Sequence, residues 1–335
     1  MVTYHIAKFD CFKSSRLMMQ AGWDTKSVFI QSKIYVGSEQ TMRLSFGKVL
    51  KVARSLGAKD VMIFHAQSAL LYLIMVRFLT RTRSQQVIYD IHDLNVIPRS
   101  WSYMRVRGMV MHIFEYISMR VMRTPVMIVS KGLAIIIAKR FKVQRPLVVR
   151  NISAELPEKP LLTGRGLKRG VYFGTFDRLP NDFFDHLYQE NHSIDIYGRF
   201  NHGKPSETME KAIHDGVVNY CGEYNPGNMK FLRDYDFLYY HIHPYDLNYR
   251  FAGPNKFFQA LAYGLVLMTP PGYSELSNVL SNQPGAHLIL KSNLSKLLQN
   301  SSIRNQQTME KIRGLLTELQ EESKRNYKQL ANHYE

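Results

Sequence analysis

A proline, an asparagine and a lysine stand together at residues 254–256. Proline suits the first turn of a helix but not its interior, so Pro254 predicts a helix start, with a helix over residues 257–263 that ends at Gly264. Backbone N–H groups at a helix start attract anions, and Lys256 adds a positive charge. The segment predicts a pyrophosphate site that uses the N–H groups of Asn255, Lys256 and Phe257. The alternative is an ordinary capped helix with a solvated lysine.

A histidine and an aspartate, His92 and Asp93, follow a predicted buried strand at residues 87–89. Parallel α/β sheets bind their ligands at the carboxyl ends of the strands, so both side chains are expected to face a ligand. A carboxylate there can accept the proton of an attacking hydroxyl group, which makes Asp93 a candidate general base. The alternative is that Asp93 caps a turn and His92 packs in the core.

Further polar residues and glycines follow other predicted strands. Gly198 and Gly222 each follow a strand, where the absence of a side chain lets the backbone approach the base and ribose of a nucleotide. The remaining candidates are Glu223 and Tyr224 for contact with a base, His243 and Tyr245 for the diphosphate, and Asp10 and Lys13 for an acceptor.

Short apolar strands alternate with helical segments along the whole chain, which is the pattern of parallel α/β sheets. In the first half, strands are predicted at residues 2–7, 27–31, 61–65, 87–89, 126–129 and 147–150, with helices at 14–21, 41–56, 69–80 and 102–123. In the second half, strands are predicted at residues 171–173, 193–197, 217–220, 237–241, 266–269 and 287–290.

The pattern stops and restarts once, around a segment that contains prolines and glycines. We therefore predict two Rossmann-like domains with a cleft between them. The predicted boundaries are residues 1–150 for an acceptor-side domain, 151–170 for a linker, 171–302 for a nucleotide-binding domain and 303–335 for a polar C-terminal helix.

Cysteine and hydropathy patterns bear on the compartment. Cys11 and Cys221 are far apart and, with the histidines, show no metal-ligand spacing, so we expect a reducing compartment and no metal. The N-terminus has no signal-peptide pattern, and no run reaches the ~18 apolar residues of a membrane span. We expect a cytoplasmic protein.

The chain has 44 Lys and Arg residues against 27 Asp and Glu residues, a formal net charge of +17. Such an excess favours nucleic acid, an anionic membrane or phosphorylated small molecules as partners. No nucleic-acid-binding module is recognisable. Residues 104–123 instead place arginines at the ends of an apolar run, which favours a helix on an anionic bilayer. The alternative is an amphipathic helix packed on its own domain.

The segment PNKFFQALAYGLVLMT at residues 254–269 resembles the "PNK-hydrophobic-E-x-x-A-x-G-x-P-V" stretch of bacterial GT-B glycosyltransferases, particularly those of family 4. The resemblance extends over most of the chain, through the segments MIVSKGLAIIIAKRF, LVVRNISAE, YFGTFDR, DIYGRF and NYCGEY in the family's order. It implies transfer of a sugar from a UDP- or GDP-linked donor, usually without a metal or other cofactor.

The resemblance also implies roles for individual residues. His92 matches a histidine that contacts the donor sugar, and Asp93 falls where inverting relatives have a catalytic base. Gly174 matches the glycine of the loop that opens the donor domain, and Arg178 matches a basic residue that neutralises the leaving diphosphate.

Two departures from family 4 leave the mechanism open. Retaining members carry two glutamates eight residues apart, whereas this chain has Phe251 and Gln259 near those positions. The Lys256 and Gln259 pair also resembles the inverting glucuronosyltransferases of xanthan-type polymer assembly. Gln259 can still hydrogen-bond a ribose or sugar hydroxyl group.

We therefore expect an enzyme of cell-surface polysaccharide synthesis (capsule, exopolysaccharide or O-antigen), peripheral on the inner face of the cytoplasmic membrane. Its partners would be a nucleotide sugar, a lipid-linked or oligosaccharide acceptor and an anionic membrane surface, with no nucleic acid. The alternative is a catalytically degenerate GT-B scaffold in the same pathway, which the missing glutamates keep open. A nucleic-acid-binding function rests on charge alone.

Overall fold

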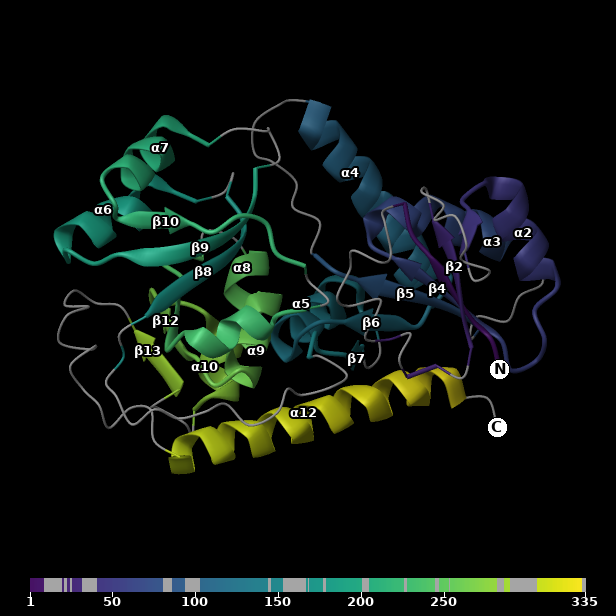
Figure 1. Ribbon diagram of the computed structural model, residues 1–335. Helices are drawn as coiled ribbons and strands as arrows, with labels where there is room; N and C mark the ends of the chain where they lie inside the picture. The colour runs from purple at the N-terminus through teal and green to yellow at the C-terminus, as the bar shows by residue number, and fades with distance from the viewer. Residues whose placement is uncertain are drawn as a thin grey trace. The chain divides into compact units, whose positions relative to one another are not determined.

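The computed structural model describes residues 1–8, 20, 23–24, 26–31, 41–80, 86–93, 103–143, 146–152, 167, 169–176, 179–200, 205–225, 228–244, 247–252, 254–281, 286–289 and 306–332. The chain divides into two compact units (Figure 1). The N-terminal unit comprises Met1–Ala154 and Leu319–Glu335, and the C-terminal unit comprises Glu155–Glu318.

The N-terminal unit is built on a parallel sheet with the strand order β3-β2-β1-β4-β5-β6-β7. The strands are β1 (Thr3–Ile6), β2 (Ser27–Gln31), β3 (Thr41–Arg43), β4 (Val61–His65), β5 (Val87–Ile91), β6 (Val126–Ile128) and β7 (Leu147–Val148). Every residue of β2, β4, β5 and β6 is buried, as expected for a parallel sheet covered on both faces.

The helices of this unit connect the strands. They are α2 (Phe46–Arg54), η2 (Gln67–Ala69), α3 (Leu70–Leu79), α4 (Tyr103–Tyr116) with its π-helical continuation η4 (Ile117–Val121), and α5 (Lys131–Phe141). Ser45 and Ser130 cap the starts of α2 and α5 by accepting hydrogen bonds from Lys48 N and Leu133 N.

The C-terminal unit contains a second parallel sheet, with the order β10-β9-β8-β11-β12-β13. The strands are β8 (Gly170–Thr175), β9 (Ile194–Arg199), β10 (Val218–Tyr220), β11 (Phe237–Tyr239), β12 (Val266–Thr269) and β13 (His287–Ile289). The helices are α6 (Asn181–Gln189), α7 (Glu207–His214), η5 (Lys230–Asp234), α8 (Leu247–Ala252), α9 (Asn255–Ala262) and α10 (Ser274–Val279). In both sheets the strand order reverses beside the first strand, which is the doubly wound arrangement.

The last helix, α12 (Gln306–Asn332), is drawn in yellow in Figure 1. The division between the units falls inside it, because Leu319–Glu335 belong to the N-terminal unit. Its buried residues Met309, Ile312, Leu316 and Leu319 follow helical spacing. Nothing in the described part of the chain is a helix long and apolar enough to span a membrane.

Several predicted elements have other bounds in the structure, and three of these differences are described here. The helix predicted at 41–56 begins with edge strand β3, which pairs with β2, and its helical part starts only after the Ser45 cap. Strand β5 continues two residues beyond the predicted 87–89 and takes in Asp90. The helix predicted at 257–263 already starts at Asn255, because Pro254 occupies the capping position. The helix predicted at 14–21 lies outside the described residues except for Gln20.

Candidate functional site

The glycines that the sequence predicted to line a nucleotide site meet at the carboxyl ends of neighbouring strands in the C-terminal sheet. Gly174 in β8 pairs with Gly198 in β9, and Gly198 N donates to Gly222 O at 2.9 Å. The sequence predicted that Gly174 and Gly198 follow their strands. In the structure both glycines lie inside the strands, one residue before the end. A Cβ at Gly198 would lie 1.7 Å from the Gly174 carbonyl oxygen, so a side chain there would force the two strands apart. The carboxyl ends of these strands therefore present bare backbone.

Lys256, in the first turn of α9, reaches the same place. A Cβ at Gly174 would lie 2.6 Å from Lys256 Nζ, which shows how closely the amine approaches that glycine. Lys256 Nζ donates to Tyr172 Oη at 3.1 Å and lies 4.2 Å and 5.0 Å from the ring centroids of Tyr172 and Tyr240. The structure thus brings Lys256, Gly174 and Gly198 together.

The ammonium group of Lys256 lies among aromatic side chains. No carboxylate within the described ranges pairs with it, and its burial lowers its pKa to about 7. A cation in such surroundings is stabilised by the arrival of an anion, which replaces the lost hydration. The arrangement can therefore hold a phosphate group.

One part of the predicted anion site is corrected. Phe257 N, which we expected to be free for a ligand, donates to Pro254 O at 2.9 Å. The turn formed around the capping proline consumes this N–H group, so it cannot serve a ligand.

The other candidates of the C-terminal unit lie on several elements. Gln259 is half-buried on α9, while Glu223 and His243 are exposed on loops. Tyr224 is half-buried, packs edge-on against Phe173 and has its pKa raised by burial. Arg178, Tyr245, Asp10 and Lys13 lie outside the described residues.

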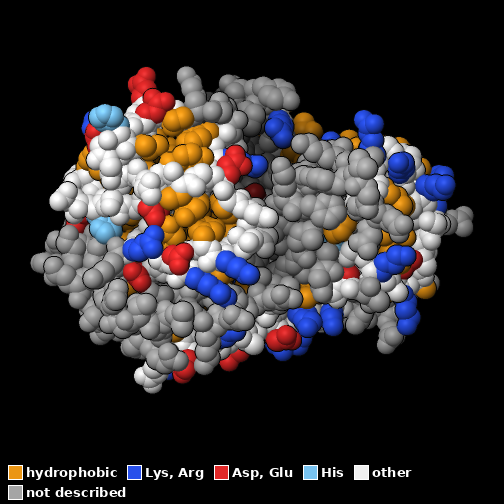
Figure 2. Space-filling view, viewed as in Figure 1, with side chains coloured by type: hydrophobic (Ala, Val, Ile, Leu, Met, Phe, Trp, Pro, Cys, Tyr) orange, Lys and Arg blue, Asp and Glu red, His pale blue; other side chains and the backbone are white. Residues whose placement is uncertain are grey.

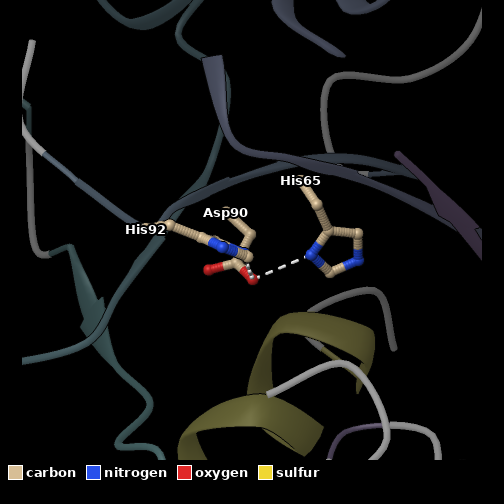
Figure 3. Close-up of side chains that lie close together, drawn as sticks. All are labelled: His65, Asp90 and His92. Atoms are coloured by element: carbon tan, nitrogen blue, oxygen red, sulfur yellow. Dashed lines mark hydrogen bonds and ion pairs between the residues drawn. The ribbon is translucent and has the colours of Figure 1, made fainter. Parts of the chain in front are cut away.

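In the N-terminal unit, His92 lies directly after β5 with 21% of its side chain exposed, and Asp93 beside it is exposed. His92 Nε2 lies 3.2 Å from Asp90 Oδ2. The same oxygen lies 2.9 Å from His65 Nδ1, and Gln20 Nε2 donates to it at 3.2 Å. Figure 3 shows both imidazole rings directed at the carboxylate of Asp90. Asp90 and His65 are fully buried.

Sequence reasoning did not select Asp90 or His65. Their signal was present, because each is a polar residue in an otherwise apolar strand, and β4 pairs with β5 so that His65 and Asp90 are register partners. Burial lowers the pKa of His65 to about 3, although Asp90 opposes this effect. His65 is therefore neutral. The carboxylate of Asp90 orients His92 through its contact with His92 Nε2.

These three residues also form the one described group with the composition of a metal site, with ligand atoms within 4.8 Å of one another. The ring nitrogens of His65 and His92 that face Asp90 lie at hydrogen-bond distances from its carboxylate. The geometry is that of a hydrogen-bonded network.

No family model and no curated protein matches the sequence. Solved structures do match. Anabaena HepE in complex with UDP and glucose has a TM-score of 0.67 at 13% identity, over 97% of this chain and 98% of that one. Sucrose-phosphate synthase from Thermosynechococcus elongatus has a TM-score of 0.65 at 11% identity, over 99% and 96%. The structure of "trehalose-6-phosphate from E. coli bound with UDP-2-fluoro glucose" has a TM-score of 0.64 at 10% identity, over 99% of each chain.

The chain has the GT-B fold of these proteins, and the predicted class of two Rossmann-like domains is confirmed. The resemblance to GT-B glycosyltransferases is confirmed at the level of fold, whereas the resemblance to family 4 stays a prediction.

Proposed function

We propose that the protein is a glycosyltransferase that takes its sugar from a UDP-linked donor. The observation that carries the proposal is the Lys256 ammonium, desolvated and without a carboxylate partner in the described structure, beside the bare backbone of Gly174 and Gly198. A UDP-sugar offers the matching group, a diphosphate. Two structures of similar fold are complexes, one with UDP and glucose and the other with UDP-2-fluoro glucose.

In the transfer, an acceptor oxygen attacks the anomeric carbon of the donor while the bond from that carbon to the diphosphate breaks. Lys256 stabilises the negative charge that develops on the leaving UDP. GDP, which the sequence left open, remains the second candidate donor.

The attacking hydroxyl group must lose its proton, and His92 is suited to take it. Asp90 accepts a hydrogen bond from His92 Nε2 and so leaves Nδ1 as the basic nitrogen. The sequence predicted Asp93 as the base; this residue is exposed beside His92 and is the alternative to it. In this proposal no step requires a metal or another cofactor.

We also propose that the acceptor is a lipid-linked glycan at the inner face of the cytoplasmic membrane, as in cell-surface polysaccharide synthesis. Helix α4 exposes five large apolar or aromatic side chains to solvent, namely Val106, Met109, Val110, Ile113 and Tyr116. Glu115 is the only acidic residue of α3, α4, η4 and α5, and it is buried. Figure 2 shows Lys and Arg side chains spread over the N-terminal unit, at the right of the view. An apolar helix face among basic side chains fits an anionic bilayer.

Calorimetric titration with UDP, UMP and uridine tests the donor site. We expect UDP to bind more tightly than UMP, because only UDP carries the β-phosphate. Lys256→Ala should weaken UDP binding about tenfold or more, which is about 1.4 kcal/mol, and should change uridine binding little. Lys51→Ala, at an exposed lysine of α2, is the matched control and should bind UDP as the wild type does.

Equal UDP affinity in the Lys256→Ala variant would contradict the phosphate site. UDP binding without turnover of any UDP- or GDP-sugar, together with no effect of His92→Ala, would favour the catalytically degenerate scaffold.

A further inference from the structure

Two tyrosine rings lie beside the amine of Lys256 in the C-terminal unit. Lys256 Nζ lies 4.2 Å from the ring centroid of Tyr172 and 5.0 Å from that of Tyr240. The two rings stack on each other, with centroids 6.0 Å apart and an interplanar angle of 25°. Both Nζ distances are below the ~6 Å within which an aromatic ring attracts a cation. The amine therefore lies where two rings attract its charged form.

The hydroxyl group of Tyr172 adds a directional contact. Lys256 Nζ donates to Tyr172 Oη at 3.1 Å, and Tyr172 Oη donates to the carbonyl oxygen of Thr175 at 3.2 Å. An ammonium group has three donors and no acceptor, so the hydroxyl group can only accept from it and must direct its own proton elsewhere. The carbonyl oxygen of Thr175 takes that proton. The hydroxyl group is thus oriented from both sides.

The sequence of β8 provides the space for this contact. Residues two apart in a strand point to the same face, so Tyr172 and Gly174 share one face of β8. A Cβ at Gly174 would lie 2.6 Å from Lys256 Nζ and 3.6 Å from Tyr172 Oη. Because glycine has no Cβ, the lysine can reach across the end of the strand to the tyrosine. A tyrosine and a glycine two residues apart thus form the surface on which the amine lies.

Other aromatic side chains hold the two tyrosine rings in place. Tyr172 is 2% exposed and packs edge-on against Phe183 of α6, with ring centroids 5.3 Å apart. Tyr240 is 3% exposed and packs edge-on against Phe257 at 4.9 Å and Tyr273 at 5.9 Å. Phe257 belongs to α9, so the helix that carries the lysine also supports the ring beside its amine. Because protein interiors are close-packed, rings enclosed in this way keep their orientation.

A tyrosine can hold the amine without competing for it. A carboxylate at this place would neutralise the lysine and would have to be displaced by an incoming diphosphate, whereas a tyrosine ring and hydroxyl group carry no net charge. A lysine side chain without such contacts loses rotamer freedom when it meets a phosphate group, and this loss weakens binding. An amine that is already in place avoids part of the loss.

We propose that Tyr172 is a positioning residue of the donor site. Its hydroxyl group and its ring, together with the ring of Tyr240, hold the Lys256 amine beside Gly174 before a diphosphate binds. This role rests on the proposed function of the site, because Lys256 is the group that meets the diphosphate. Tyr172 is buried in β8 and acts through Lys256.

Calorimetric titration of Tyr172→Phe with UDP and uridine tests this role. The substitution keeps the ring and its packing and removes only Oη. We expect UDP affinity to fall about three- to tenfold, because Lys256 must then be ordered on binding, and uridine affinity to stay unchanged. Tyr188→Phe is the matched control, since the Tyr188 hydroxyl group donates to Asp215 and the ring contacts the exposed Lys211. This variant should bind UDP as the wild type does.

The proton taken up on UDP binding separates positioning from a purely structural role. Tyr172 Oη accepts a hydrogen bond from the ammonium form of Lys256, so its loss should lower the pKa of Lys256 in the free protein below about 7. At pH 7 Tyr172→Phe should therefore take up a larger fraction of a proton per UDP than the wild type, measured in two buffers of different ionisation enthalpy. Looser packing would instead admit water and raise this pKa, which gives the opposite change.

Two further variants complete the test. Tyr172→Leu removes the ring as well as the hydroxyl group and should weaken UDP binding more than Tyr172→Phe does. In the Lys256→Ala background, Tyr172→Phe should have no further effect on UDP affinity, because the hydroxyl group acts only through the lysine.

The proposal would be overturned by unchanged UDP affinity in Tyr172→Phe, by equal losses for UDP and uridine, or by a smaller proton uptake at pH 7. Equal UDP affinities of Tyr172→Phe and Tyr172→Leu would overturn the role of the ring. Lys256→Ala distinguishes this proposal from the proposed function. If Lys256→Ala also binds UDP as the wild type does, the phosphate site itself is wrong. If it weakens UDP binding while Tyr172→Phe does not, only the role of Tyr172 is wrong.

Discussion

At the scale of single residues, the low pKa of Lys256 makes UDP binding depend on pH. The free site, with its pKa near 7, is mostly neutral at pH 8.5, whereas the site with a diphosphate bound favours the ammonium form. Binding above pH 7 therefore takes up a proton. UDP affinity should fall as pH rises above 7, by up to about tenfold per pH unit.

Calorimetry in two buffers of different ionisation enthalpy measures that proton directly. At pH 8.5 we expect uptake of close to one proton per UDP in the wild type and close to none in Lys256→Ala. UDP binding by the wild type with no proton uptake would show that Lys256 is already charged in the free protein, or that it does not meet the diphosphate.

The candidate residues of the two units differed in how far they could be predicted from the sequence. Pro254, Lys256 and the strand-end glycines have local signals, because a helix start and a glycine before a loop are visible in a few residues. His65 and Asp90 lie apart in the sequence and meet only because β4 and β5 are neighbours in the sheet. A histidine inside an apolar strand does not by itself reveal its partner.

At the scale of elements, the second half of α12 is fastened to the N-terminal unit by a buried arginine. Arg150 Nη1 donates to Glu322 Oε2 at 2.7 Å, and Arg150 N donates to Ser323 Oγ at 3.1 Å. The Arg150 side chain is 2% exposed, so the loss of the Glu322 charge would leave a buried cation with poorer compensation.

Glu322→Gln should therefore destabilise the N-terminal unit by about 1–3 kcal/mol. Glu321→Gln, at the preceding and more exposed glutamate, should change the free energy of unfolding by less than about 0.5 kcal/mol. Denaturant unfolding, monitored by the hydrogen exchange of the backbone amides in β1, β4 and β7, measures the change in the free energy of unfolding of this unit alone. Equal effects of the two substitutions would show that the Arg150 contact contributes little.

Hydrophobic periodicity predicted that α12 exists but not what it covers. The spacing of Ile312, Leu316 and Leu319 marks an apolar stripe, and helical periodicity is a local property. Its contacts with Asp24 and Arg150 connect residues more than 170 positions apart. The same limit applies to β3, whose three residues become a strand only because the edge of β2 is available to pair with them.

At the scale of the whole molecule, the class of fold was predictable because strands and helices alternate in two separate series. That repetition survives errors of two or three residues at the element ends. Solved structures at 10–13% identity share the fold while no family model matches, so the fold is kept where most residue identities are not.

The placement of charge and apolar surface leads to the last prediction, which concerns the membrane. The protein should sediment with vesicles that contain phosphatidylglycerol, and the bound fraction should fall in 0.5 M salt, where the Debye length is below about 5 Å. The double substitution Val110→Ser and Ile113→Ser removes two exposed side chains of α4, with relative exposures of 42% and 54%, and should weaken vesicle binding about tenfold. Leu247→Ser, at an exposed leucine of α8 in the C-terminal unit, is the matched control and should bind as the wild type does.

If the double variant binds as tightly as the wild type, α4 is not the docking face. Equal binding to neutral phosphatidylcholine vesicles would show that the basic side chains contribute nothing, and the surplus positive charge would then need another partner.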